Sequence, residues 1–303
     1  MRIAVIGAGA LGLFYGAMLQ RAGNDVHFLL RRDHDAIMAG GLMVYSVDGD
    51  FCLPKVNGYR TPQEIGQADL VIVGLKTFAN HRFQELLTPL VGDDTLILTL
   101  QNGLGNEEML ASLFGEERIL GGVAFLCSNR GEPGVVHHLG EGRIILGEYL
   151  RGKTIRAEPV AALFRAAGVD CRVTPDYKKA RWEKLVWNIP FNGLCALMLK
   201  PVDELLALDA MRRLIIDMMG EVIEGGNAQG LIKNIPGSLA ENMVSFSINL
   251  GQYRPSMLID RLEGRPLELD AIFGAPLAAA HEKGIEMPRV QELHALLQLA
   301  EKG

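Results

Sequence analysis

The chain begins with a short apolar run that stops at a glycine-rich hexapeptide. Residues 2–6 read RIAVI, and Gly7, Ala8, Gly9, Ala10, Leu11 and Gly12 follow at once in the pattern GxGxxG. The first glycine of this pattern permits a tight turn, the second lets a pyrophosphate approach the backbone, and the third lets a helix pack closely on a strand. A helix over residues 10–22 would present free N–H groups to that anion. The start of the chain therefore predicts a dinucleotide-binding strand–loop–helix unit.

The residues after the second expected strand, over residues 25–30, indicate which dinucleotide this is. A site for NAD usually has Asp or Glu here, whereas this strand runs into Arg31 and Arg32. A guanidinium can bind a 2′-phosphate through two hydrogen bonds, and a carboxylate would repel it. Asp33 and Asp35 lie just beyond and leave NAD open, although they read more naturally as the first residues of the next helix. We expect NADPH/NADP as the cofactor, with Arg31 as the principal ligand and Arg32 as a helper or a solvated neighbour.

The rest of the first half alternates between apolar runs and helical stretches. Further strands are expected over residues 70–75 and 95–100, and this alternation predicts a parallel sheet covered by helices. Two antiparallel pairs should extend the sheet. One spans residues 41–56 and turns at Asp48-Gly49. The other joins residues 134–139 to residues 143–146 through Gly140-Glu141-Gly142. A helix over 153–167 and a strand over 171–174 complete this half.

Strand-like runs nearly vanish after Pro175-Asp176. Long helical stretches follow over residues 177–199, 210–229, 237–250, 267–282 and 289–301. The predicted fold is an α/β Rossmann-type dinucleotide-binding domain over residues 1–175, followed by an all-α domain for substrate and catalysis over residues 176–303.

Composition limits the classes of protein that the chain can belong to. With 303 residues it is long enough for two domains, and 49% hydrophobic with 22% charged residues is the balance of a soluble globular protein. A net charge of −6 argues against a non-specific nucleic-acid binder. The longest uncharged apolar stretch, residues 189–199, is too short to cross a bilayer, and the N-terminus has no signal peptide pattern. We expect a cytoplasmic protein with no nucleic-acid or membrane partner, for which a homodimer remains open.

The cysteines and histidines show no metal-ligand spacing. The four cysteines include no CxxC pair and are interpreted as reduced, mostly buried thiols: Cys52, Cys127, Cys171 and Cys195. His137-His138 lies on an expected strand without other ligands nearby, so no metal site is predicted.

Polar residues follow two of the expected parallel strands. Lys76 comes after the strand at 70–75, and Asn102 comes after the strand at 95–100. In open α/β sheets ligands bind beyond the carboxyl ends of the strands, so both residues lie where cofactor and substrate would meet. The alternatives are a solvated surface lysine at position 76 and a simple turn at Asn102-Gly103.

The expected helix over residues 177–199 carries a polar stripe on an otherwise apolar surface. Lys184, Asn188 and Asn192 are spaced i, i+4 and i+8 and share one face. An almost entirely apolar helix is expected to be buried, so this stripe must face a ligand, a partner or water. The pKa of a buried lysine falls, which suits proton donation near neutral pH. The alternative is an internal hydrogen-bond network, and Pro190 should kink the helix within the stripe.

Taken together, these motifs resemble the ketopantoate reductase (2-dehydropantoate 2-reductase) family, whose members are NADPH-dependent enzymes of pantothenate biosynthesis. The resemblance covers nearly the whole chain and rests on the order and spacing of modest motifs. They are GAGALG at 7–12, LLR at 29–31, LK at 75–76, QNGLG at 101–105, WEKLVWNIPFN at 182–192, and PSMLID with LELD between 255 and 270.

The resemblance implies a role for each polar residue that was singled out. Lys184 would donate a proton to the C2 oxygen of the substrate as hydride arrives from the nicotinamide. Glu268 would hold the nascent hydroxyl beside Lys184, and Ser256 would contact the substrate carboxylate. Asn188 and Asn192 would hydrogen-bond the polar end of the substrate.

The resemblance also implies roles for residues near the cofactor and for one residue outside the substrate-binding set. Asn102 would lie between the nicotinamide and the substrate, with Lys76 close by. Arg31 would bind the 2′-phosphate. Asp260 matches a position of the family, and we expect a structural or outer role for it. Without the resemblance, the polar residues between 256 and 270 would read as helix caps and surface positions.

Two segments of the chain differ from the sequences that are usual in the family. Residues 192–196 read Asn-Gly-Leu-Cys-Ala where Asn-Pro-Leu-Thr-Ala is common, and Tyr253-Arg254-Pro255 replaces a stretch rich in Asn and Ser. The expected reaction is reduction of 2-dehydropantoate, a small-molecule 2-oxo acid, to (R)-pantoate. The alternatives are an NADP-dependent reductase of another branched 2-oxo acid, a 3-hydroxyacid dehydrogenase-type enzyme, and a non-catalytic NADP sensor.

Overall fold

The computed structural model describes residues 1–150 and 152–302. The chain divides into two compact units. The first comprises Met1–Gln101 and Asn106–Tyr177, and the second comprises Asn102–Gly105 and the chain from Lys178 onward. The predicted domain boundary after residue 175 lies two residues before the observed one, which follows Tyr177. The sequence analysis placed segment 102–105 in the first domain, whereas the structure places it in the second unit. Residues 151 and 303, which fall inside the two predicted domains, lie outside the described residues.

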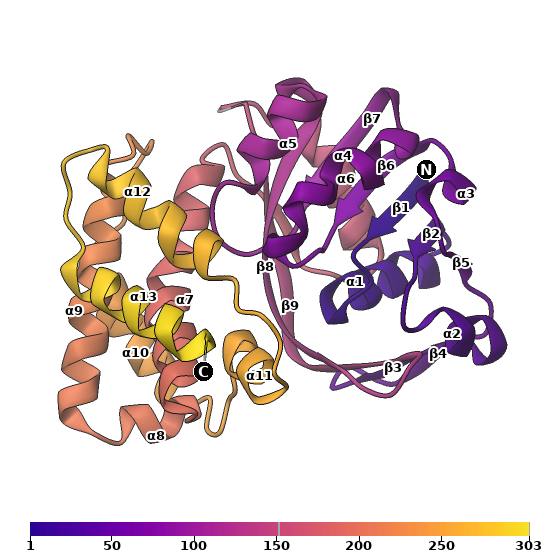
Figure 1. Cartoon of the computed structure of the whole chain (residues 1–303). Coiled ribbons are helices and arrows are strands. Elements are labelled where there is room, and N and C mark those ends of the chain that lie inside the picture. The colour runs from indigo at the N-terminus through magenta and orange to yellow at the C-terminus, as the bar shows by residue number, and fades with distance from the viewer. Residues whose placement is uncertain (151, 303) are drawn as a thin grey trace. The chain divides into compact units, whose positions relative to one another are not determined.

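The described part of the first unit forms a mixed ten-stranded sheet in the order β4-β3-β9-β8-β7-β6-β1-β2-β5, with β10 also paired to β9 (Figure 1). Strand β1 is central and parallel to β2 and β6, and β7 continues the parallel part of the sheet. The strands are β1 Arg2–Ile6, β2 Asp25–Leu29, β3 Leu42–Ser46, β4 Phe51–Leu53, β5 Asn57–Tyr59, β6 Ala68–Val73, β7 Val91–Thr99, β8 Ile119–Arg130, β9 Val135–Glu148 and β10 Cys171–Val173.

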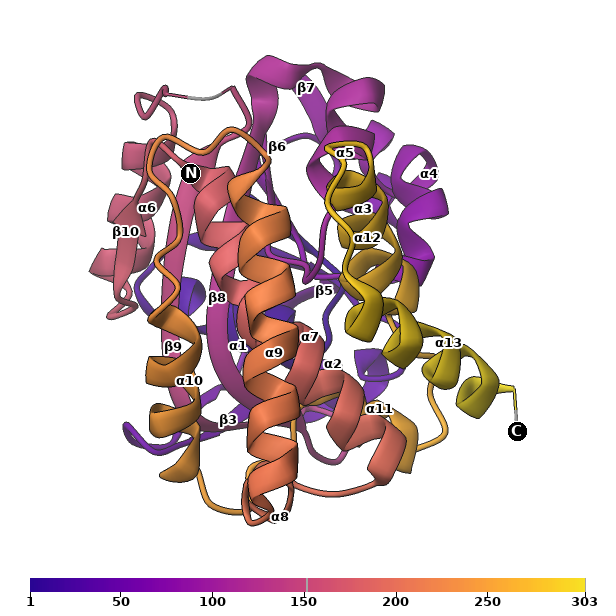
Figure 2. The same cartoon turned by 90° about the vertical axis from the view of Figure 1, so that its left-hand side faces the viewer.

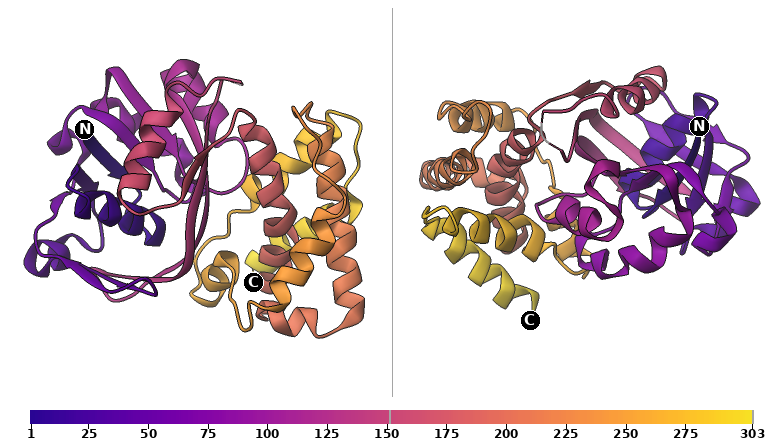
Figure 3. Two further views of the ribbon diagram at one scale, coloured as in Figure 1. Left: turned by 180° about the vertical axis from the view of Figure 1, so that it is seen from behind. Right: turned by 90° about the horizontal axis from the view of Figure 1, so that it is seen from above.

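Helices cover both faces of the parallel part of this sheet, which explains its continuous apolar sequences. Residues Ile3 and Val5 of β1 pack with α1 and α6, whereas Ala4 and Ile6 pack with α3, α4 and α5. Figure 3 shows helices on both sides of the sheet. All four side chains are fully buried. The helices are α1 Ala10–Arg21, α2 His34–Gly40, α3 Pro62–Ile65, α4 Phe83–Leu87, α5 Asn106–Phe114 and α6 Ala157–Ala166, with 3-10 turns η1 Thr77–Arg82, η2 Thr88–Leu90 and η3 Glu116–Arg118.

One of the two expected antiparallel pairs is confirmed and the other is wrong. Strands β3 and β4 pair antiparallel, as predicted for residues 41–56. Residues 140–142, however, do not form a turn, because β9 runs continuously through them and pairs antiparallel with β8 along its length. Residues 140–142 have positive φ angles because they form an irregular stretch inside the strand. In this stretch the pairing register between β9 and β8 shifts twice. Tyr15 Oη and His138 Nε2 donate hydrogen bonds to the carbonyls of Gly142 and Glu141 there, at 3.1 and 2.9 Å.

Strand β8, which the sequence analysis did not identify, carries a glycine that makes room for an aromatic ring. Gly121 of β8 lies opposite Gly147 of β9 in the ladder. A Cβ atom added at Gly121 would lie 2.1 Å from Cζ of Tyr177, and one at Gly147 would lie 2.6 Å from Cβ of Tyr177. The hydroxyl of Tyr177 donates a hydrogen bond to the buried carboxylate of Glu107. This glycine pair therefore seats the first residue of the long helix that leads into the second unit.

The second unit is helical, as predicted. Its described helices are α7 Tyr177–Met198, α8 Val202–Leu206, α9 Asp209–Asn227, α10 Leu239–Ile248, α11 Ser256–Leu262, α12 Ala275–His281 and α13 Pro288–Glu301, with a π-helical turn, η4, at Asp270–Gly274. Helix α7 continues through Pro190. Helix α9 packs against α8, α10, α12 and α13 (Figure 2). None of the described helices is long and apolar enough to span a membrane.

The glycine at position 121 provides a test of this packing. We expect Gly121→Ala to lower the free energy of unfolding by about 1–3 kcal/mol, because the methyl group overlaps the ring of Tyr177. The control is Gly220→Ala in α9, where a Cβ would meet no atom within 4 Å. It should be neutral or stabilise by up to about 1 kcal/mol through helix propensity. Denaturant titration measures both values, and equal effects of the two substitutions would contradict the packing described.

Candidate functional site

The three glycines of the first loop have three different surroundings. Gly7 has φ +97°, and a Cβ there would lie 2.4 Å from the backbone nitrogen of Leu75, just beyond the end of β6. A Cβ at Gly12 would lie 2.3 Å from the carbonyl oxygen of Gly7. No side chain fits at either position, so these two glycines hold the loop against β6 and against the start of α1.

Gly9 differs from the other two glycines because the space where a side chain would start is empty. A Cβ atom at Gly9 would meet no atom within 4 Å. Gly9 is the N-cap of α1, makes no side-chain cap, and is followed by no acidic residue in the first turn. The first N–H groups of a helix have no partner within the helix and favour an anion. The loop therefore offers an open backbone cradle that fits a phosphate group.

The arginines and aspartates after β2 have different partners. The side chain of Arg31 is exposed and makes no hydrogen bond or ion pair with another described residue. Arg32 Nη2 donates to the carbonyl of Gly131 at 3.1 Å. Asp33, at the N-cap position of α2 as its sequence suggested, is buried; its carboxylate is paired with Arg130 and accepts a hydrogen bond from the Gly134 amide. Arg31 is thus available to a ligand, whereas the carboxylate of Asp33 is already engaged.

A buried glutamine, which the sequence analysis did not select, links the ends of β6 and β7. Gln101 is 3% exposed, and its Nε2 donates to the carbonyl of Leu75 at 2.9 Å and to Asn80 Oδ1 at 2.7 Å. Its Oε1 accepts from Thr99 Oγ1 at 2.9 Å. Lys76 lies half-buried beside these groups as the N-cap of η1, so it is not a fully solvated lysine. The signals for Gln101 in the sequence were its place directly before Asn102 and its place as the first residue of the motif QNGLG at 101–105.

In the second unit, Asn102 is joined to the lysine of the polar stripe. Lys184 Nζ donates a hydrogen bond to Asn102 Oδ1 at 2.6 Å. Segment 102–105 belongs to this unit although the residues on both sides of it belong to the first. Asn102-Gly103 is therefore not a simple surface turn, since its side chain and backbone are held by helices of the second unit.

The two asparagines of the stripe have different environments. Asn192 is 2% exposed, and its Oδ1 accepts hydrogen bonds from the Met257 amide at 3.1 Å and from Ser256 Oγ at 3.4 Å. It therefore caps the first turn of α11. Asn188 is 5% exposed, and its side-chain amide makes no hydrogen bond to another described residue. The amide of Asn188 therefore keeps its hydrogen-bonding capacity for a ligand or water.

Two acidic residues of the second unit are also buried. Glu268, 3% exposed, comes shortly before the π-helical turn η4. Asp260, 2% exposed, accepts a hydrogen bond from Arg265 Nε at 2.8 Å. The structure thus joins Lys184 to Asn102 and Asn192 to Ser256, and it buries Glu268 in the same unit.

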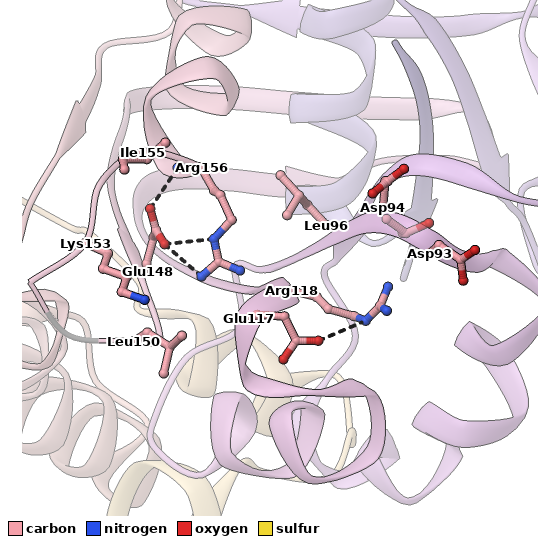
Figure 4. A pocket seen from close by; sticks show the side chains of 11 residues that line it. Asp93, Asp94, Leu96, Glu117, Arg118, Glu148, Leu150, Lys153, Ile155 and Arg156 are labelled. Carbon is pink, nitrogen blue, oxygen red and sulfur yellow. Dashed lines mark hydrogen bonds and ion pairs between the residues drawn. The ribbon is translucent and has the colours of Figure 1, made fainter.

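A pocket of about 510 Å³ lies at the opposite edge of the first unit's sheet, at the amino ends of β7 and β8 (Figure 4). Two of its acidic side chains form ion pairs with two of its basic ones, Glu148 with Arg156 and Glu117 with Arg118. None of the predicted site residues lines it. Because ligands of open α/β sheets bind at the carboxyl ends of the strands, we do not place the functional site in this pocket.

All four cysteines are free; Cys171 and Cys195 are buried, Cys127 is partly buried and Cys52 is exposed. Burial raises the pKa of the Cys171 and Cys195 thiols to about 12, which keeps both protonated and unreactive near neutral pH. Among the described residues, no three His, Cys, Asp or Glu side chains are grouped to hold a metal ion.

Comparison with known proteins gives two family matches that together cover most of the chain. Residues 3–151 match the model "Ketopantoate reductase PanE/ApbA", and residues 176–301 match the model of the C-terminal domain of the same family. A 2-dehydropantoate 2-reductase of Nostoc sp. is 43% identical over 302 residues, which is 98% of this chain and 94% of that protein.

Solved structures agree with these matches. A crystal structure of 2-dehydropantoate 2-reductase from Geobacter metallireducens GS-15 has a TM-score of 0.98 and 65% identity, covering 99% of this chain and 100% of that one. The same enzyme from Methylococcus capsulatus has a TM-score of 0.89 and 30% identity, covering 99% and 97%.

The matched regions include the open glycine cradle of the first unit and the Lys184–Asn102 pair of the second. The first matched region falls within the sheet-containing unit, except for segment 102–105, and the second covers most of the helical unit. The chain therefore belongs to the ketopantoate reductase family of oxidoreductases.

Proposed function

We propose that this protein reduces 2-dehydropantoate to (R)-pantoate with NADPH, in the cytoplasm. The observation that carries the proposal is the hydrogen bond of 2.6 Å between Lys184 Nζ and Asn102 Oδ1, one helical turn from Asn188, whose side-chain amide makes no hydrogen bond within the described chain. The 43% identity to a curated 2-dehydropantoate 2-reductase, over nearly the whole chain, supports the choice of substrate.

The role of Lys184 follows from the charge that develops during the reaction. When NADPH is bound, its nicotinamide supplies the hydride that converts the C2 carbonyl into an alkoxide. The ammonium of Lys184 stabilises the negative charge on the C2 oxygen and gives it a proton, which completes the alcohol. Asn102 Oδ1 accepts one N–H of Lys184 and so fixes the direction of the remaining N–H groups. Glu268 is proposed to accept a hydrogen bond from the new hydroxyl.

The other polar groups are assigned to the ends of the substrate. Ser256, at the first position of α11 and hydrogen-bonded to Asn192, is proposed to bind the substrate carboxylate. Asn188 is proposed to bind the terminal hydroxyl, because its side-chain amide makes no hydrogen bond within the described chain. Once a bound substrate excludes water, leaving such a group without a partner costs about 1–3 kcal/mol, so a substrate that satisfies it is favoured.

The first unit is proposed to select NADPH. The open backbone at Gly9 and the start of α1 fit the pyrophosphate, and Lys76 lies beyond the neighbouring strand β6. Arg31 is the exposed guanidinium with no described partner, and it is assigned to the 2′-phosphate. The carboxylate of Asp33 would repel that phosphate, but Arg130 already neutralises it.

A panel of 2-oxo acids tests the substrate. We expect NADPH oxidation with 2-dehydropantoate, and a kcat/KM lower by about 5- to 150-fold with trimethylpyruvate, which lacks only the terminal hydroxyl. The drop reflects the Asn188 amide left without a partner. Spectrophotometric assays of both substrates measure this ratio. Turnover of another branched 2-oxo acid, with none of 2-dehydropantoate, would refute the proposed substrate and favour a related reductase.

Removal of the lysine tests the mechanism. We expect Lys184→Ala to lower kcat by about 10²–10⁴-fold, since it removes the proton donor. Lys178→Ala serves as the control because Lys178 is an exposed residue of the same helix, and it should keep the wild-type kcat. Retained activity in Lys184→Ala would remove this residue from the mechanism and favour a non-catalytic NADP sensor.

Cofactor selection is tested at the neighbouring arginines. Arg31→Ala should weaken NADPH binding by about 10- to 150-fold, since a charge-assisted hydrogen bond contributes about 1.5–3 kcal/mol, and should leave NADH binding nearly unchanged. Arg32→Ala should change the NADPH affinity less, because Arg32 is bonded to the Gly131 carbonyl. Nucleotide fluorescence titrations give the dissociation constants of NADPH and NADH for the wild type and both variants. Equal losses for both nucleotides in Arg31→Ala would contradict the assignment of the 2′-phosphate.

A further inference from the structure

The π-helical turn η4 leaves one backbone carbonyl without a partner inside its own helix. The amide of Ala275 donates to Asp270 O, five residues back, instead of to Ala271 O, four residues back. The residue five positions after Ala271 is Pro276, which has no N–H group. The Ala271 carbonyl is therefore free of both bonds that a helix could supply. Such single π turns often occur at functional sites.

Segment 102–105 supplies the hydrogen-bond donor for the carbonyl of Ala271. The amide of Leu104 donates a hydrogen bond to Ala271 O at 2.9 Å. Gly103 lies directly on the turn, since a Cβ there would lie 2.3 Å from Ala271 O and 2.7 Å from Ala271 Cβ. Gly103 also has φ +81°, a conformation that favours glycine. Any side chain at position 103 would push the segment away from η4.

Two proposed site residues, Asn102 and Glu268, lie close in sequence to the residues that make these contacts, Gly103 and Leu104 on one side and Ala271 on the other. Asn102 directly precedes Gly103, and its Oδ1 accepts the hydrogen bond from Lys184. On the helical side, the carbonyl of Glu268 accepts the amide of Ile272 at 3.1 Å, so Glu268 is held by the residue after Ala271. One turn of backbone therefore holds both Asn102 and Glu268.

We propose that Gly103 is a positioning residue for the reduction, which seats Asn102 against Lys184 by docking on the Ala271 carbonyl released by Pro276. The proposal rests on the proposed function for its activity readout. Asn102 is thereby placed by the helical unit that contains Lys184, although it follows a strand of the sheet. The asparagine and lysine then act as one assembled pair, whose geometry depends on the absence of a side chain at position 103.

The first experiment compares two glycines of the same segment. Gly105 also has positive φ, +90°, but a Cβ there would meet no atom within 4 Å. We expect Gly103→Ala to lower kcat by about 10²-fold with the dissociation constant of NADPH unchanged, because small displacements of reacting groups cost about this much. Gly105→Ala carries the same kind of backbone strain without the clash and should stay within about threefold of the wild-type kcat. Equal losses in the two variants would refute the proposal.

A double-mutant cycle separates positioning from general damage to the fold. If Gly103 acts through Asn102, Gly103→Ala should lower kcat less than about threefold in an Asn102→Ala background. Loss of the same factor in both backgrounds would show that the glycine acts independently of Asn102 and would overturn the proposal. The melting temperature of each variant is measured alongside.

Pro276→Ala provides a second route if Gly103→Ala does not fold. The new amide at position 276 can bond to Ala271 O or Ile272 O within the helix and compete with Leu104. We expect a smaller loss of kcat, about three- to tenfold, which also disappears in the Asn102→Ala background. No change of kcat in Pro276→Ala would contradict the role of the released carbonyl.

The labelling of Lys184 by acetic anhydride gives a readout that needs no substrate. Quantified by peptide mass spectrometry, the acetylation rate of Lys184 should change in Gly103→Ala and in Asn102→Ala, and the double variant should match Asn102→Ala. An unchanged rate in Gly103→Ala would refute the positioning role. Inactivity of the wild-type protein toward 2-dehydropantoate, with the labelling pattern intact, would refute only the proposed function.

Discussion

The first unit depends on a backbone contact so close that no side chain fits within it. Gly7, at the exit of the central strand, lies against the backbone after β6, and Gly12 lies against Gly7 itself. These two approaches fix where α1 starts relative to the strand ends. Because the loop is pinned on both sides, its middle glycine, Gly9, faces open space. The cradle for an anion is therefore a consequence of how tightly its neighbours are packed.

The second unit uses similar polar side chains for different tasks. Asn192 closes the start of α11, Lys184 holds Asn102, and Asn188 keeps an unpaired amide among the described residues. Burial makes the two hydrogen-bonded states costly to break, since a buried polar group without a partner destabilises the fold. A substitution at Asn192 would therefore change stability and binding together, whereas Asn188 has no side-chain hydrogen bond within the described chain to lose.

Local patterns in the sequence were sufficient for much of the fold. The apolar run before Gly7 and the spacing of Lys184, Asn188 and Asn192 depend on neighbours along the chain, so strand, loop and stripe were predictable. Residues 140–142 misled the prediction because glycines with positive φ serve both turns and bulges, and only the partner strand β8 distinguishes them.

Parts of the site were also beyond the reach of local patterns. The residues of the π turn η4 were expected to form part of one regular helix over 267–282. The change of hydrogen-bond spacing shows only in the bond from the Ala275 amide to Asp270 O, five residues back instead of four. The network of Gln101 joins residues from three separate segments. Tertiary contacts of this kind leave no periodic signal, and so Asn102 could be selected from its strand end while the docking of Gly103 could not.

Strand β9 offers its outer edge to two partners in succession. Residues 135–138 pair with β3 and residues 144–146 pair with β10, with the irregular stretch between them. During synthesis the β3–β4 hairpin leaves the ribosome long before β9 exists, and a two-stranded hairpin is only marginally stable alone. Its edge therefore stays unpaired until β9 has emerged, which is the period when a nascent chain is exposed to wrong edge-to-edge pairing. Completion of this part of the sheet must then be a late step in the folding of the first unit.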